Sequence, residues 1–543
     1  MKHNNIKISR KIPFFLILII VFLSGCNDTF SLQEDPKDQL SEATFWNTKS
    51  DVEQAIRACY RAENWTGWWN NFNGWTIVGI KFEGWTDIIS NKEFGSGFPE
   101  DGIVPTNSQV KDMWSSNYVF IARTNYFLEN IDKVNLTADE KAAFIAEAKF
   151  LRAYSYFWLS QLYGNVPLVE KTLTFDEANS IGQATKEEVV NFIINDLKEA
   201  AQNLPLKRPA VEKGRVEKGA ALALMGRLLM SEHKWSEAAQ TYKQIMDLNR
   251  YIIDPRFKVL FQAEGDNSDE IIFSREYMQD QFGEPFTQQA CKPGQLGGYN
   301  QFSFMQNFVD KFLMIDGKSI DESPMYDPKN PFNNRDPRLY ATVFLPNYSI
   351  VRGQLYIGHP DSTNQTGPGL TGYGVNKFFD QNFKGNVWSY GGDYKLIRYA
   401  EVLLSYLESK LEAGDNITQS LLDETINKIR GREEIQMAPV TETDPNKLRE
   451  IIRNERAVEF ACEGGIRYWD LIRWKIAVEV LNSKFYGMKI TDNPAGYNGK
   501  YIINDKGNIF IQERKFYDRY YLWPIPQSEM DINKNLVQNP GYN

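Results

Sequence analysis

The chain contains very little histidine and cysteine for its length. Its 543 residues include three histidines and four cysteines. His233 and His359 are far apart, and no two of the cysteines have the close spacing of a zinc motif. The cysteines are Cys26, Cys59, Cys291 and Cys462. We therefore expect no cofactor and three small buried thiols. A structural calcium ion in the Asp- and Asn-rich loops is left open.

An excess of positive charge is also lacking. The chain has 61 basic and 70 acidic side chains, a net charge of -9, whereas a nucleic-acid-binding protein needs a basic face. The sequence has no G-x-S-x-G, no H-E-x-x-H and no phosphate-loop motif. We expect a protein that is not an enzyme and has no nucleic-acid partner.

Long apolar runs are missing after the N-terminus. Residues 12–23 are apolar and follow a basic head, but twelve residues make only about 18 Å of helix, and a span needs roughly 20 residues. The run ends at Leu23-Ser24-Gly25-Cys26, which is typical of a bacterial lipoprotein signal. The sequence predicts a signal peptide over 1–25 and acylation, including palmitate, at Cys26. A polar tether over 26–40 would then join the lipid anchor to the folded part.

The rest of the chain has helical periodicity interrupted by loops. Expected helices cover residues 41–59, 110–130, 138–162, 186–203, 219–248 (a helix pair), 394–412, 418–430, 445–463 and 467–481. Thr185 followed by Glu188 is a capping box. We divide the folded part into an N-terminal region, 41–250, and a C-terminal region, 251–543, whose first part is rich in loops.

The helix pair at 219–248 has an informative register. Leu222, Gly226, Ala238 and Tyr242 fall where a 34-residue tetratricopeptide repeat places a large, a small, a small and an aromatic residue. Because such repeats need neighbours to be stable, we expect a mainly α-helical, right-handed superhelix of about four helix pairs. The alternative on spacing alone is an unrelated helical bundle.

Five segments, in order along the chain, are similar to the SusD/RagB family of outer-membrane lipoproteins. They are EAKFLRAY with YGNVPL (147–154 and 163–168), RDPRL (335–339), RYAEVLL (398–404), RNER with EGGIRYWDLIRWK (453–456 and 463–475), and WPIP with QNPGY (523–526 and 538–542). The charged residues at Arg456, Glu459, Glu463, Arg467 and Asp470 have three- and four-residue spacings, so we read them as scaffold ion pairs along helices.

The resemblance implies a SusD-like fold with a loop-rich, irregular ligand-binding side. It also implies a glycan ligand, a SusC-type TonB-dependent transporter as partner, and a place on the outer membrane facing the cell exterior. Glycan-binding residues vary between members of this family, so none can be transferred by position.

Tryptophan is concentrated in one short stretch. Trp65, Trp68, Trp69, Trp75 and Trp85 lie within 21 residues, out of 13 in the chain, among glycines and asparagines. An indole can lie flat against the C–H face of a sugar while nearby polar groups bind its hydroxyls. Polar candidates are Asn70, Asn71, Asn73, Asp87 and Asn91.

A second loop region adds aromatic candidates, namely Tyr299, Phe302, Tyr373, Trp388 and Tyr390. The predicted glycan-binding residues are Trp68, Trp75, Trp85, Tyr299 and Trp388. Some of the clustered tryptophans are expected to fill the gap between loop and scaffold instead.

Three other functions compete with glycan capture for import. A surface glycoside hydrolase needs two carboxylates about 5 to 10 Å apart across a cleft, which sequence does not exclude. A pure assembly scaffold would bind only protein, and a related capture protein would take peptides in place of glycans.

Overall fold

The computed structural model describes residues 45–60, 82–91, 102–284, 287–358, 371–490 and 501–542. The predicted signal peptide, the lipid site Cys26 and the tether lie outside these residues. So do Trp65, Trp68, Trp69 and Trp75, with the polar candidates Asn70, Asn71 and Asn73.

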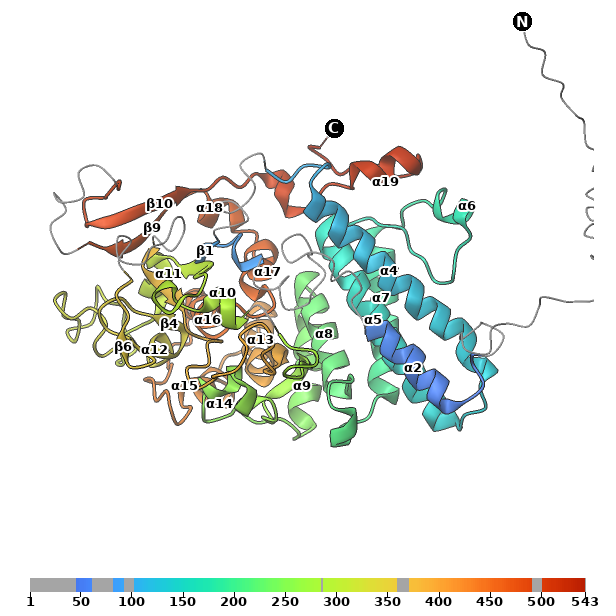
Figure 1. Cartoon of the computed structure of the whole chain (residues 1–543), viewed down its shortest axis with the longest axis horizontal. Helices are drawn as coiled ribbons and strands as arrows, with labels where there is room; N and C mark the ends of the chain where they lie inside the picture. The colour runs from blue at the N-terminus through green and yellow to red at the C-terminus, as the bar shows by residue number, and fades with distance from the viewer. Residues whose placement is uncertain are drawn as a thin grey trace, which may run out of the picture.

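One half of the molecule consists of long helices that pack side by side (Figure 1). Its elements are α2 (Lys49–Tyr60), α4 (Ser108–Asn130), α5 (Ala138–Tyr163), α6 (Phe175–Ala178), α7 (Lys186–Asn203), α8 (Lys218–Ser231) and α9 (Trp235–Asp247). Helix α4 packs against α5, α5 against α7, and α8 against α9. The mainly helical fold class is thereby confirmed. The tetratricopeptide superhelix stays a prediction, with which these successive pairs agree.

Local signals fix where the helices begin. Thr185 and Glu188 form the predicted capping box: the Thr185 hydroxyl accepts from the Glu188 amide, and the Glu188 carboxylate accepts from the Thr185 amide. Thr137 and Glu140 do the same for α5. Each box satisfies two backbone donors that a helix start otherwise leaves without a partner.

The helix pair α8/α9 follows the predicted repeat register. A Cβ on Gly226 would lie 2.5 Å from the ring of Tyr242. Only glycine at this position of α8 therefore leaves room for the Tyr242 ring of α9. Leu222, Ala238 and Tyr242 are buried as expected. Helix α13 (Tyr399–Glu412) packs on the other side of α9, so the C-terminal region extends the same helical layer.

Gly226→Ala should therefore destabilise the protein by about 1–2 kcal/mol. The added methyl group overpacks the contact with Tyr242, and the free energy lost there exceeds what alanine gains from its better helix propensity. Thermal unfolding followed by circular dichroism measures the effect. Gly182→Ala is the matched control, since a Cβ there meets nothing within 4 Å. Equal melting temperatures for the two variants would contradict the close approach.

The other half is built from short elements joined by loops (Figure 1). Its strands are β1 (Ile89–Asn91), β2 (Ile271–Arg275), β3 (Phe302–Phe304), β4 (Val343–Phe344), β5 (Ile350–Val351), β6 (Gln354–Leu355), β7 (Tyr373–Val375), β8 (Tyr394–Arg398), β9 (Lys484–Lys489) and β10 (Asn508–Glu513). Its helices are α10 (Thr287–Cys291), α11 (Gln306–Lys311), α12 (Arg338–Thr342), α14 (Gln419–Glu424), α15 (Ile426–Arg430), α16 (Pro445–Glu459), α17 (Ile466–Arg473), α18 (Ala477–Leu481) and α19 (Gln527–Ile532). Strands β1, β3, β7 and β4 form one sheet, in that order.

Three of the expected helices are wrong in detail. Residues 394–398 form β8, because they pair with β2 in an antiparallel ribbon, and the helix begins only at Tyr399. Helix 418–430 is split at Thr425, where φ is -122° and ψ is -99°. Helix 467–481 is interrupted at Lys475, whose φ of 57° is left-handed.

Buried ion pairs fix α16 to the loop-rich half. Both oxygens of Glu459 accept from guanidinium groups: Arg432 at 2.9 Å, Arg338 at 3.0 Å and Arg398 at 3.1 Å. Burial alone would raise the pKa of Glu459, but the charges of these three arginines outweigh it and hold that pKa well below its usual range. The predicted scaffold role of this charged segment is confirmed.

Most of these pairs join distant segments instead of running along one helix as predicted. Arg456 binds Asp470 at 2.8 Å across the turn between α16 and α17, and Arg467 binds Asp87, 380 positions away. The pair Asp470–Arg473, at 2.8 Å, has the expected three-residue spacing.

A single large core cluster runs from Trp46 to Leu536 and includes residues of both regions. The division at residue 250 stays a prediction. Cys59, Cys291 and Cys462 are buried and free, as expected. No helix in the described part of the chain combines the length and apolar character needed to cross a bilayer.

Candidate functional site

The ribbon of β2 and β8 carries two surface turns at one end. Its other end is fixed by Arg398, which binds Glu270 at 2.5 Å and Glu463 at 2.6 Å inside the core. The turn after β2 reaches Phe282, and the loop that leads into β8 contains Trp388. A buried network therefore holds one end of the ribbon while the opposite end reaches the surface.

Backbone and side-chain contacts join these two turns to each other. Glu284 and Tyr390 form an antiparallel bridge, and the Asp280 amide donates to the Ser389 hydroxyl at 2.7 Å. Gly283 lies against Ser389 so closely that a Cβ would be 2.2 Å from the Ser389 Cα. Phe282 and Trp388 therefore lie on adjacent stretches of backbone.

Tyr299 and Trp388, two of the predicted glycan-binding residues, are in contact. Their ring centroids are 5.7 Å apart and the planes are inclined by 60°. Tyr299 is 44% exposed and Trp388 is half-buried. The Tyr299 amide donates to the Gln289 carbonyl of α10 at 3.1 Å, so the backbone of a helix positions this ring.

We define the aromatic platform as Phe282, Tyr299 and Trp388. Phe282 is 47% exposed and stacks on Tyr277 at 5.8 Å with an interplanar angle of 12°. Arg275 covers the Phe282 ring at 5.3 Å. The sequence prediction missed Phe282, although an aromatic residue between Gln281 and Gly283 in a polar turn gives the same signal as the tryptophan-rich stretch.

Tyr390 lies two residues after Trp388 and holds this loop in place. It is buried, its hydroxyl accepts from the Ala263 amide at 2.8 Å, and it donates to Asp380 at 3.2 Å. Burial raises the pKa of Tyr390, so the phenol stays protonated and can donate. Phe302 and Tyr373, the other two aromatic candidates of this region, are buried in the sheet of β3 and β7.

Trp85 is a correction to the predicted site. It is only 5% exposed, and its ring lies 5.0 Å from Phe82 and 5.3 Å from Trp523 in the main core. In this position its indole has no face open to a ligand, so we remove it from the candidate residues. Asp87 is also structural: burial would raise its pKa, but the charge of Arg467 outweighs it and lowers the pKa to about 2.

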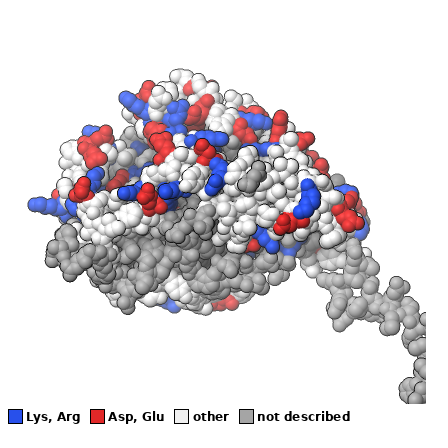
Figure 2. Space-filling model, turned by 90° about the horizontal axis from the view of Figure 1, so that it is seen from above, with Lys and Arg blue, Asp and Glu red and all other residues white. Residues whose placement is uncertain are grey.

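Two acidic side chains close to the platform have structural partners. The Glu284 carboxylate accepts from the Thr287 amide at 2.7 Å and from its hydroxyl at 2.6 Å, which caps α10. Asp380 accepts from the backbone amides of Asn382 and Phe383. Among the described residues, no three His, Cys, Asp or Glu side chains lie together so that they could hold a metal ion. The structural calcium ion stays a prediction. Figure 2 shows acidic and basic side chains interspersed over the face in view.

Two family models together match most of the chain. Residues 259–542 match the model described as SusD family, and residues 27–230 match the model described as starch-binding associating with outer membrane. The chain is 24% identical to a SusD-like protein of Formosa agariphila over 98% of this chain and 99% of that protein. It is 25% identical to the starch-binding protein SusD of Bacteroides thetaiotaomicron over 78% and 76%.

Solved structures give the same result. A SusD-like carbohydrate-binding protein from Bacteroides fragilis is 34% identical, with a TM-score of 0.84 over 91% of this chain and 100% of that one. A laminarin-binding SusD-like protein has a TM-score of 0.62 at 22% identity, over 91% of this chain and 100% of its own, a likeness of fold alone.

Proposed function

This chain belongs to the SusD family, and we propose that it captures a glycan on the aromatic platform and delivers it to a transporter. The observation that carries the proposal is the contact between Tyr299 and Trp388 at the surface end of an anchored ribbon. The relative from Bacteroides fragilis is named as carbohydrate-binding, which supports the same ligand class here.

The chemistry of the platform suits a sugar. A pyranose ring offers a flat C–H face that an exposed aromatic ring covers, and its hydroxyl rim needs placed polar groups. Gln279 and Asp280 are exposed on the same turn as Phe282. Because the buried network and the Tyr390 hydrogen bonds hold the loops in place, little freedom is lost on binding, which favours affinity.

The rest of the capture function follows from the N-terminal sequence and the family. We propose that acyl chains on Cys26 anchor the protein in the outer membrane facing the exterior, and that a SusC-type TonB-dependent transporter receives the glycan. Two or more acyl chains anchor a protein stably where one is marginal.

We propose capture without cleavage. A glycoside hydrolase needs a pair of carboxylates facing the scissile bond, whereas Glu284 and Asp380 already accept hydrogen bonds that build the loops. A peptide-binding variant of the family is the second candidate, and the same platform would take an aromatic or proline-rich peptide.

A retardation gel with a panel of polysaccharides tests the proposal. We expect at least one polysaccharide to slow the purified protein, and no release of reducing ends from that polysaccharide after long incubation. A protein of similar size with no carbohydrate affinity is the control. Retention by none of the polysaccharides would remove the glycan ligand, and release of reducing ends would favour the hydrolase.

A further inference from the structure

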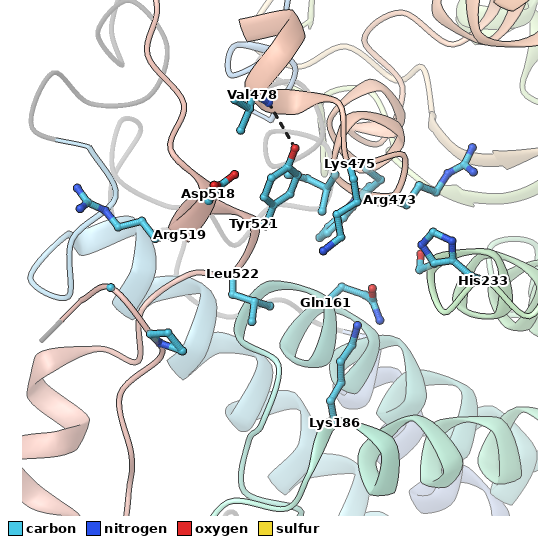
Figure 3. A pocket seen from close by; sticks show the side chains of 15 residues that line it. Gln161, Lys186, His233, Arg473, Lys475, Val478, Asp518, Arg519, Tyr521 and Leu522 are labelled. Carbon is cyan, nitrogen blue, oxygen red and sulfur yellow. Dashed lines mark hydrogen bonds between the residues drawn. The ribbon is translucent and has the colours of Figure 1, made fainter. Parts of the chain in front are cut away.

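A groove of about 890 Å³ lies apart from the platform residues, between the ends of the scaffold helices and the C-terminal segment (Figure 3). Its lining comes from the end of α5, the start of α7, the end of α8, the turn after α17 and residues 518–522. This volume falls in the range of about 300–1,000 Å³ that ligand pockets occupy. We call it the cationic groove and define it by Gln161, Lys186, His233, Lys475, Tyr521 and Leu522.

The basic side chains of this groove differ in whether a carboxylate already binds them. Lys186 binds Glu232 at 2.8 Å, and Arg473 binds Glu408 at 2.5 Å. Lys475 and His233 are exposed and form no ion pair with any described residue. The Lys475 ammonium instead lies 5.3 Å from the ring centroid of Tyr521. The groove therefore presents one ammonium group without a carboxylate partner, Lys475, and an imidazole donor, while Asp518 is the one acidic side chain of its lining.

Both of these side chains belong to residues that end a helix in the left-handed conformation. His233 follows the end of α8 with φ 56°, and Lys475 follows the end of α17 with φ 57°. In each case the hydrogen bonds are those of a helix C-terminus: the Lys234 amide donates to the Leu229 carbonyl, and the Ile476 amide donates to the Leu471 carbonyl. Figure 3 shows Lys475, His233, Gln161 and Lys186 converging on the opening from different elements.

The remaining lining contains one acidic and one basic side chain, Asp518 and Arg519, and is otherwise apolar or neutral. Tyr521 and Leu522 form one wall, and the Gln161 amide donates to Glu232 at 2.8 Å on the floor. A ligand that suits the groove therefore carries an anionic group for Lys475 and His233, a flat C–H face for the wall, and hydroxyls for the amide.

We propose that the cationic groove is a second binding site, for an acidic oligosaccharide that carries a carboxylate or a sulfate group. The inference rests on the proposed glycan capture for its choice of a sugar over a peptide. It adds a site, and it restricts the glycans to those with negative charge. The anionic group lies between the Lys475 ammonium and the His233 ring, and a sugar ring lies against Tyr521 and Leu522.

Calorimetry with short oligosaccharides tests this. Tetragalacturonate supplies carboxylates, a κ-carrageenan tetrasaccharide supplies sulfates, and maltotetraose is the neutral match. We expect at least one acidic tetrasaccharide to bind the purified protein at least tenfold more tightly than maltotetraose. Because each variant removes one donor to the anionic group, Lys475→Met or His233→Asn should weaken that binding about tenfold, which corresponds to about 1.4 kcal/mol.

The variants are chosen to leave the fold intact. Asparagine tolerates the left-handed backbone at position 233, and methionine keeps the unbranched stem of Lys475. Lys484→Met is the matched control, because Lys484 is exposed on β9 and is not part of the groove lining. Melting temperatures close to that of the unmodified protein establish that each variant is folded.

The platform variant Tyr299→Ala/Trp388→Ala distinguishes the two sites. If it keeps the acidic ligand while Lys475→Met loses it, the groove is the site, whatever polysaccharide gels report about the platform. Unchanged binding in Lys475→Met and His233→Asn overturns the proposal and leaves the platform hypothesis intact. The proposal is also overturned if neither acidic tetrasaccharide binds, or if a tetraglutamate peptide binds more tightly than both tetrasaccharides.

Discussion

Glu459→Gln should destabilise the protein by about 3–5 kcal/mol, the cost of removing one partner from a buried charge network. Glu459 is fully buried and its two oxygens accept from Arg338, Arg398 and Arg432. Glutamine keeps the shape but replaces one acceptor by an NH₂ group, which then faces a guanidinium donor. Urea denaturation of the purified protein should show an earlier midpoint.

The pH dependence of this difference has a definite sign. The folded pKa of Glu459 lies below its unfolded value of about 4.3, so the unfolded chain binds more protons and the carboxylate stabilises the fold above that pH. The difference in the free energy of unfolding between the unmodified protein and Glu459→Gln should be constant from neutral pH down to about pH 5. It should become smaller in stronger acid. Glutamine does not titrate, so it provides the reference.

Glu450→Gln is the matched control on the same helix. Glu450 binds Arg453 at 2.8 Å, but its side chain is 70% exposed, and surface ion pairs contribute about 1 kcal/mol at most. If both variants unfold at the same urea concentration, the network is not what joins α16 to the loop-rich half.

The helices could be predicted because their signals are local. A capping box needs residues three positions apart, and the contact of Gly226 with Tyr242 needs a register of 16 positions within one helix pair. Strand β8 could not be predicted, because residues 394–398 become a strand only through pairing with residues 271–275. An apolar run of this length suits a helix or a strand until its partner is known.

Contacts between residues far apart in the sequence also explain which predicted site residues are wrong. Trp85 follows a glycine in a polar stretch, as a surface residue would, yet Tyr468 and Trp523 lie against its ring. Charge spacing indicated that Arg467 belongs to the scaffold but not that its partner is Asp87. Tyr299 and Trp388 were selected because they are aromatic residues in loops, and the structure brings them into contact.

Tyr299→Ala/Trp388→Ala should weaken binding of the retained polysaccharide about a hundredfold, taking about 1.4 kcal/mol for each ring. Each substitution removes a ring face that a sugar would cover, and the second one also removes the support that the first ring receives across 5.7 Å. Because the two rings touch, the single variants need not add up to the double one, and the full cycle measures their coupling. Retardation gels over a series of polysaccharide concentrations give the four affinities.

Phe175→Ala is the matched control for this cycle. Phe175 is 82% exposed on α6, in the helical half of the molecule. The variant therefore loses an exposed aromatic ring while the platform stays unchanged. Trp85→Ala provides a contrast, since it should lower the melting temperature through a core cavity before it changes affinity. If the double platform variant is retained as strongly as Phe175→Ala, the glycan does not bind to the rings at the end of the ribbon. The proposed capture site would then have to be sought elsewhere on the chain.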